Sequence, residues 1–155
     1  EDMGVERFLI TSSVNGVLAQ RLVRRLCNAC KTVITPGKEY LESSGLAAFM
    51  QDDSVICEAR GCSECMGTGY SGRTSIHELF ALDDEMHRVI MSGADATSLH
   101  AAARRQGMIT LYEDGLRKVV RGVTSLEEVL QVTQDQSESR PVDDTGEAEK
   151  PRALA

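Results

Sequence analysis

Apolar residues near the start of the chain form two predicted elements. Residues 8–10 make a short apolar run, which is typical of a buried strand. Ser12 and Ser13 are candidate N-caps, and apolar residues recur after them at helical spacing, which predicts a helix over residues 14–26. An internal glycine weakens this helix, and residues 21–26 fit equally well a strand that leads into the first cysteine.

The middle of the chain predicts a turn, a helical stretch and two strands. Thr35-Pro36-Gly37-Lys38 is typical of a turn, and residues 40–50 have the pattern of a short helical segment. Two aspartates break that segment. The runs 54–59 and 73–79 then predict strands.

The C-terminal half predicts a series of short helices with regular punctuation. Each has a polar N-cap candidate before its apolar positions, and a glycine closes the first three. The caps and closing glycines are Asp83 with Gly93, Asp95 or Thr97 with Gly107, and Thr110 with Gly122. Thr124-Ser125-Leu126-Glu127 fits a capping box that opens the fourth helix. The spacing is too irregular for a solenoid repeat.

Composition narrows the classes of protein that the chain can represent. Its 155 residues are 41% hydrophobic, enough for one modest core or for part of a larger one. Aromatic residues are only 4% with no Trp, so the core is aliphatic and a base-stacking surface is not expected. A net charge of −7 argues against nucleic acid as a partner.

The two ends of the chain differ in character. Glu1 is not an initiator residue, and an apolar segment follows almost at once, so we expect a fragment that lacks its true N-terminus. Residues 134–155 are rich in acids and almost free of large apolar side chains. Such a segment cannot offset its own ordering entropy, and we predict a disordered acidic tail.

Two Cys-x-x-Cys pairs carry the candidate chemistry. Cys27 and Cys30 form the first pair, and Cys62 and Cys65 form the second. Two such pairs complete the tetrahedral sulfur shell of a structural zinc site, with no position left open for catalysis. The 31 residues between the pairs are more than a compact zinc ribbon uses, so a separate excursion is expected there.

Disulfide bonds are the alternative explanation for these cysteines. The chain has no signal peptide, no apolar run long enough to span a membrane, and an odd count of five cysteines. These features favour a reducing, cytoplasmic setting and a metal site. The fifth cysteine, Cys57, lies in a strand-like run and is predicted to be a buried small hydrophobe. Four bases near the ligands either offset the thiolate charge or form a solvated face: Arg24, Arg25, Lys31 and Arg60.

Several longer motifs resemble the type II secretion and type IV pilus assembly ATPases (the GspE/PulE/PilB family). The similarity covers residues 3–133, nearly everything outside the tail. The segments that carry it are 12–27 leading into the first pair, 61–79 with Cys62-x-x-Cys65-x-Gly67-Thr68-Gly69-Tyr70-x-Gly72-Arg73, 107–115, and 122–130. The joint pattern is highly specific, whereas each piece alone is weak.

The resemblance implies an α/β fold, the C-terminal end of a RecA-like P-loop ATPase domain with a tetracysteine zinc-binding insertion. The implied segments are 1–26 as the end of the ATPase core, 27–70 as the zinc-binding subdomain, 71–82 as a returning strand, 83–133 as a helical subdomain and 134–155 as the tail. The implied complete protein is a cytoplasmic homohexamer, peripheral at the inner membrane but not inserted in it. Its implied partners are a platform protein and a cytoplasmic docking component of a secretion or pilus machine.

Two departures qualify that resemblance. Asn28 stands where the family often has proline after the first cysteine, so a stiffer turn is lost while the ligands remain. No phosphate-binding loop is present, because Gly37-Lys38 is followed by Glu39 and has no glycine five positions earlier. ATP with Mg²⁺ is therefore expected only in the full-length protein, and this chain alone, without Walker A or Walker B, is expected to be inactive.

Two other functions fit parts of the pattern. The second pair resembles one cysteine-rich repeat of DnaJ-like chaperones, but the first pair lacks the glycines of such a repeat. A zinc-ribbon nucleic-acid binder conflicts with the acidity and the few aromatic residues. No catalytic residue is assigned. His77 and Glu78 are neighbours on a predicted strand and so point to opposite faces.

Overall fold

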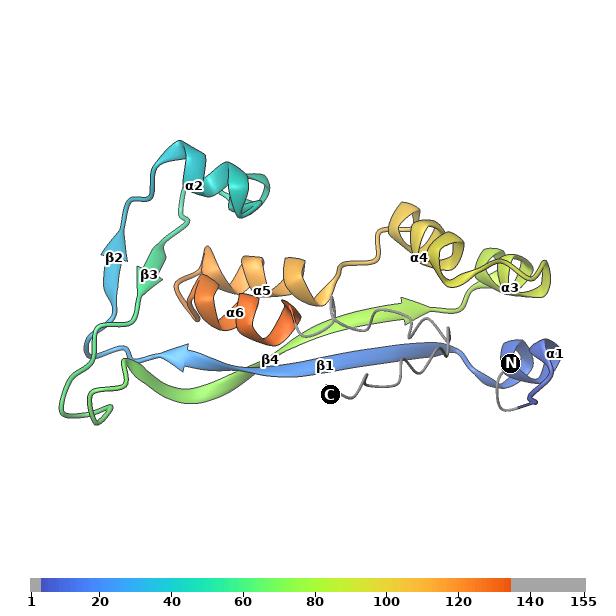
Figure 1. The fold of residues 1–155 in the computed structure, drawn as a ribbon, viewed down its shortest axis with the longest axis horizontal. Helices are drawn as coiled ribbons and strands as arrows, with labels where there is room; N and C mark the ends of the chain where they lie inside the picture. The colour runs from blue at the N-terminus through green and yellow to red at the C-terminus, as the bar shows by residue number, and fades with distance from the viewer. Residues whose placement is uncertain (1–3, 135–155) are drawn as a thin grey trace, which may run out of the picture.

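The computed structural model describes residues 4–134, so the predicted tail lies, apart from its first residue, outside the described range. Figure 1 shows an elongated molecule arranged along one long β-ribbon. Strands β1 (Gly16–Leu26) and β4 (Tyr70–Ala81) pair antiparallel in this ribbon, with an irregularity between Arg24 and Leu26. A second antiparallel pair, β2 (Thr32–Ile34) and β3 (Ile56–Glu58), lies at one end of the ribbon.

Strand β1 corrects the helix predicted for residues 14–26. The same apolar positions are also compatible with a strand, and β4 supplies hydrogen-bonding partners between Gly16 and Leu26. Val23 and Ile76 are fully buried on one face of the ribbon, beneath the C-terminal helices. Leu18 and Leu22 occupy the other face and are 59% and 51% exposed. The alternative of a strand leading into the first cysteine was therefore right, and the strand is longer than expected.

Helix α1 (Arg7–Ser13) corrects the strand predicted for residues 8–10. A strand needs a neighbour for its backbone groups, whereas this segment packs against α3 at the far end of the ribbon. Phe8 and Leu9 are 64% and 52% exposed, so the apolar run marks a surface rather than a core. Short apolar runs do not distinguish the two structures by pattern alone.

The excursion between the cysteine pairs contains the predicted helical stretch and one unpredicted strand. Helix α2 (Lys38–Ser43) and the 3₁₀ turn η1 (Leu46–Phe49) fall within or close to residues 40–50. Gly45 joins them with a φ of 68°, a left-handed conformation that glycine adopts without steric cost. Strand β3 lies inside the predicted run 54–59, and its partner β2 was not predicted.

The four C-terminal helices are present as predicted: α3 (Asp84–Met91), α4 (Ala96–Arg105), α5 (Leu111–Val119) and α6 (Leu126–Gln134). Asp83 caps α3 and Asp95 caps α4, each accepting a backbone N–H at 2.8 Å. Thr110 forms a capping box with Glu113 at the start of α5.

The N-cap of α6 lies one residue after the one that the predicted capping box requires. Ser125, not Thr124, accepts the N–H of Glu128, at 3.4 Å. The Thr124 hydroxyl instead donates to the carbonyl of Arg24, at 2.8 Å, and the Glu128 carboxylate turns to Arg24 rather than back to the cap. A contact with a distant strand therefore decides which of two adjacent hydroxyls caps the helix.

The hairpin of α5 and α6 holds the largest core. It covers one face of the ribbon and also buries Leu46 and Ile56 of the excursion. The buried members of this core are Leu46, Ile56, Leu116, Val119, Val120, Leu126 and Val129. A smaller cluster around Met86 joins α3 to α4. The excursion thus has little core of its own and depends on the hairpin.

We predict that Gly115→Ala destabilises the protein. Gly115 is buried in α5, and an added Cβ would lie 2.4 Å from Cγ1 of Val129 in α6. Overpacking of this kind costs about 1–3 kcal/mol, and the better helix propensity of Ala returns at most about 1 kcal/mol. Urea unfolding followed by circular dichroism measures the net loss.

Gly37→Ala is the control for this substitution. No atom lies within 4 Å of a Cβ at Gly37, and its φ of −66° suits any residue. We expect its free energy of unfolding to change by less than about 0.5 kcal/mol. Wild-type stability in Gly115→Ala would mean that α5 and α6 pack less closely than described.

Candidate metal centre

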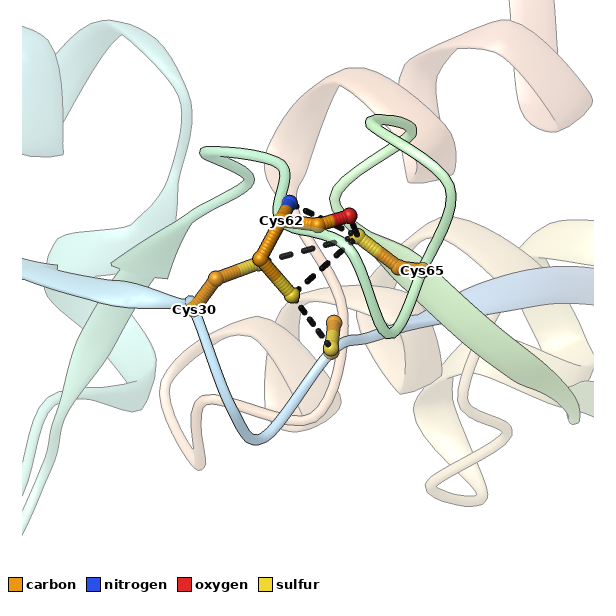
Figure 2. Close-up of side chains that lie close together, drawn as sticks. Cys30, Cys62 and Cys65 are labelled. Carbon is orange, nitrogen blue, oxygen red and sulfur yellow. Dashed lines mark hydrogen bonds between the residues drawn. The ribbon is translucent and has the colours of Figure 1, made fainter.

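Four cysteines that are distant in sequence converge at one end of the ribbon. Cys27 directly follows β1, and Cys30 lies shortly before β2. Cys62 and Cys65 belong to the turn that connects β3 to β4. The four sulfurs all lie within 4.8 Å of one another, and Figure 2 shows three of these side chains gathered around a common point.

The distances between the sulfurs fit one tetrahedral metal ion. Sγ of Cys62 lies 3.7 Å from Sγ of Cys65 and 4.0 Å from Sγ of Cys27. Sγ of Cys30 lies 3.8 Å from Sγ of Cys65. A tetrahedron with metal–sulfur bonds of about 2.3 Å has edges of about 3.8 Å. All five cysteines are free thiols, so the disulfide alternative does not apply to this arrangement.

Tight backbone turns bring the members of each pair together. In the first pair, the N–H of Cys30 donates to the carbonyl of Cys27 at 3.2 Å. In the second, the N–H of Gly67 donates to the carbonyl of Cys62 at 2.8 Å. Gly61 allows the closest approach, because a Cβ there would lie 2.5 Å from the carbonyl oxygen of Gly67. These glycines let the second turn fold back on itself.

Two backbone amides point at the sulfur of Cys65. The N–H groups of Cys62 and Gly69 each donate to it at 3.1 Å. Desolvation opposes ionisation of this thiol, but these amides and the neighbouring thiols outweigh it and lower the pKa of Cys65 to about 6. The site therefore favours a thiolate at this position at neutral pH.

The thiols do not all ionise together without a counter-charge. The pKa of Cys30 is raised to about 11, chiefly by desolvation. Hydrogen bonds with the three other cysteines also raise it, and one backbone amide opposes the rise. A divalent cation resolves this conflict because it takes the place of the protons at every sulfur. The donor set is thus suited to a soft or borderline metal such as Zn²⁺.

Cys57 stands apart from this cluster, as predicted. It is 2% exposed, lies in β3, and is not among the cysteines that could share an ion. A Cβ at Gly122 would lie 3.1 Å from its sulfur, so Cys57 packs closely against the loop between α5 and α6. Its role is that of a small buried hydrophobe.

Two of the four nearby bases have partners other than the thiolates. Nζ of Lys31 donates to the carbonyl of Gly122 at 3.0 Å. The guanidinium of Arg24 pairs with Glu128 and lies over the Tyr70 ring, 4.1 Å from its centroid. Arg25 and Arg60 are exposed. The main contacts of Lys31 and Arg24 are thus with groups other than the sulfurs.

One buried residue was missed by sequence reasoning. Glu128 is 5% exposed, and its Oε2 accepts the backbone N–H of Arg24 at 3.0 Å. The hydrogen bond from the Arg24 side chain, strongest among several influences, lowers the pKa of this carboxyl. The spacing of Ser125 and Glu128 also fits a capping box, and that pattern was the available signal.

The histidine and glutamate at positions 77 and 78 act separately. The backbone N–H of His77 donates to Oδ2 of Asp114 at 2.9 Å, and Oε2 of Glu78 accepts the N–H of Leu111 at 3.1 Å. Both contacts fasten β4 to the start of α5.

Across residues 4–134, no helix is long and apolar enough to cross a bilayer.

Fold and cysteine geometry together define the class: a mixed α/β chain whose four cysteines are placed to hold a metal ion. Residues 1–131 match the family model described as "Type II/IV secretion system protein". The chain belongs to this family, as its motifs predicted. The match favours this family over the DnaJ-like module and the zinc ribbon.

Individual relatives agree with the family match. The chain is 48% identical over 130 residues to "Type IV pilus assembly ATPase PilB" of Thermus thermophilus, covering 84% of this chain and 15% of that protein. It is 48% identical over 134 residues to "Type II secretion system protein HxcR" of Pseudomonas aeruginosa, covering 86% and 24%. It is 43% identical over 136 residues to "Type II secretion system protein E" of Xanthomonas campestris, covering 86% and 24%. The chain thus spans less than a quarter of the length of these relatives.

We predict one tightly bound zinc ion per chain, released by Cys62→Ser. The substitution replaces a thiolate with a hydroxyl that stays protonated at neutral pH, so the sulfur shell is incomplete. Elemental analysis of the purified protein measures the metal content. Cys57→Ala is the control, because Cys57 lies outside the cluster, and it should retain the full content. Equal metal content in wild type and Cys62→Ser would show that the ligand assignment is wrong.

Proposed function

We propose that this chain is the C-terminal, zinc-binding part of an ATPase that powers type II protein secretion or type IV pilus assembly. The convergence of four sulfurs at tetrahedral distances, in a chain of the secretion family, is the observation that carries this proposal. The relatives' names supply the activity: one is a pilus assembly ATPase and others are secretion proteins.

The role of the zinc ion in this proposal is structural. Cys27, Cys30, Cys62 and Cys65 hold it in a closed four-thiolate shell, which leaves no position for substrate or water. Zinc contributes roughly 10–16 kcal/mol of apparent binding free energy in small zinc-dependent folds. Contributions of that size are enough to fix the excursion of residues 27–70 onto the ribbon.

The ribbon belongs, in this proposal, to the edge of a RecA-like ATPase core. Residues 1–26 and 71–82 contribute to that core, and residues 83–133 form a helical subdomain after it. Support comes from the bare face of the ribbon, where Leu18, Leu22 and Leu79 are 59%, 51% and 57% exposed. An isolated two-stranded ribbon is marginally stable, so further core packed on this face would stabilise it.

ATP and Mg²⁺ bind elsewhere in the complete protein. Among the described residues, Gly37 and Lys38 lie at the start of the short helix α2, and no loop there has the spacing needed to cradle phosphates. The complete protein would act in the cytoplasm as a homohexamer, peripheral to the inner membrane. Its partners would be the platform protein and the docking component of the machine, and residues 27–70 would supply a surface for subunit or partner contact.

We predict that the 155-residue chain alone releases no phosphate from ATP above a heat-inactivated control. The sequence lacks the phosphate-binding loop whose backbone amides bind phosphates and whose hydroxyl holds Mg²⁺. A coupled phosphate assay at saturating ATP measures this. Phosphate release that scales with chain concentration would contradict the assignment of ATP binding to the rest of the protein.

A second experiment tests the cellular role. We expect the full-length gene carrying Cys62→Ser and Cys65→Ser together to fail to restore secretion or surface pili in a deletion strain, whereas Cys57→Ala restores them. Immunoblots of both variants check that the loss is not caused by absence of the protein. Full restoration by the double variant would overturn the structural role of zinc, and no requirement for the wild-type gene in either process would overturn the function itself.

A further inference from the structure

A buried carboxylate lies at the junction between the ribbon and the C-terminal helices. Glu128, on the first turn of α6, is the only charged side chain among residues 4–134 that is buried. Its two oxygens both contact Arg24: Oε2 accepts the backbone N–H at 3.0 Å, and Oε1 pairs with the guanidinium. A buried charge is costly unless it is paired, so this position fixes the backbone of β1 at Arg24.

Arg24 carries this constraint towards both cysteine pairs. It precedes Cys27 by three residues, and its guanidinium stacks on Tyr70, 4.1 Å from the ring centroid. Tyr70 directly follows Gly69, whose N–H donates to Sγ of Cys65 and whose carbonyl accepts the N–H of Cys27 at 2.9 Å. The backbone segments that carry the two cysteine pairs therefore lie next to each other beside Arg24.

The loop between α5 and α6 completes the contact. The N–H of Leu26 donates to the carbonyl of Val123 at 2.9 Å, and the Tyr70 hydroxyl lies 2.8 Å from Oγ of Ser125. Lys31, immediately after Cys30, reaches the carbonyl of Gly122. Hydrogen bonds thus join residues 122–128 to the segments on both sides of the first cysteine pair. They also join this loop to Tyr70, which follows the second pair.

We propose that Glu128 is a positioning residue for the four-cysteine metal centre, acting through Arg24 and Tyr70. The inference rests on the zinc binding proposed above. Glu128 touches no sulfur. It holds in place the backbone segments that aim the cysteines, as partners of metal ligands do in other centres. The coupling is reciprocal, so the bound metal must in turn stabilise the start of α6.

Glu128→Gln tests this role in the zinc-loaded chain. Glutamine keeps the size of the side chain but removes the charge that pairs with Arg24. We expect zinc transfer to an excess of a colorimetric chelator to be about tenfold faster than in wild type, in line with the about 10–100-fold loss of metal affinity that changes around metal ligands produce. Cobalt-substituted protein should show a shifted or weaker thiolate charge-transfer band.

Glu113→Gln is the matched control. Glu113 also pairs with an arginine: both of its oxygens accept from the guanidinium of Arg104 at the start of α5, away from the segments that carry the cysteines. Glutamine also preserves the capping box at this site. We expect its zinc transfer rate to stay within about twofold of wild type, because loss of stability alone does not act on the centre.

A double variant separates positioning from general loosening. If Glu128 acts through Arg24, then Arg24→Gln combined with Glu128→Gln should release zinc no faster than the faster single variant. Equal rates in Glu128→Gln and Glu113→Gln, or fully additive effects in the double variant, would overturn the proposal.

Two further measurements keep the result interpretable. Circular dichroism shows whether Glu128→Gln folds, and if it does not, Tyr70→Phe replaces it, because that change removes only the hydroxyl bonded to Ser125. Tyr70→Phe should then release zinc faster than wild type, and an unchanged rate would count against the coupling. Absence of zinc from the wild-type chain would instead refute the proposed metal function.

Discussion

The arrangement of this chain depends on closing a long loop at four sulfurs. The two cysteine pairs are separated by 31 residues, and those residues hold only short strands and helical turns. Ordering such a segment costs conformational entropy that its own few apolar contacts cannot offset. A metal ion held by Cys27, Cys30, Cys62 and Cys65, as proposed, would reduce the freedom of the open chain, and burial of Leu46 and Ile56 under α5 and α6 adds hydrophobic stabilisation. The proposed metal bonds at the base of the excursion and the hydrophobic contacts at its far end would therefore act together.

Much of the local structure follows from the sequence because it depends on near neighbours. The Cys-x-x-Cys spacing gives two turns, and the caps Asp83, Asp95 and Thr110 start their helices as expected. Each of these interactions joins residues within four positions of one another, so the printed order of residues is sufficient to find them. The candidate metal ligands could be identified from the sequence for the same reason, because the spacing within each cysteine pair marks them.

The errors occur where a distant contact decides between two local solutions. Residues 16–26 have apolar positions compatible with helix or strand, and pairing with β4, some fifty residues away, selects the strand. Thr124 and Ser125 are both able to cap α6, and the carbonyl of Arg24 takes one of the two hydroxyls. Glu128 was overlooked because acidic residues in the first helical turn are ordinary, and only its partner in β1 makes it buried. Such choices require tertiary information that no short window contains.

The shape of the ribbon has a mechanical consequence. Strands of this length extend about 35 Å. The cysteine cluster lies where β1 ends and β4 begins, and helices α1, α3 and α4 lie towards the other end of the ribbon. If an arm of that length turns as one body, a rotation of about 10° at one end becomes a displacement of about 6 Å at the other. Any tilt of this arm is therefore amplified along its length, so that a small angular step at one end becomes a much larger displacement at the other.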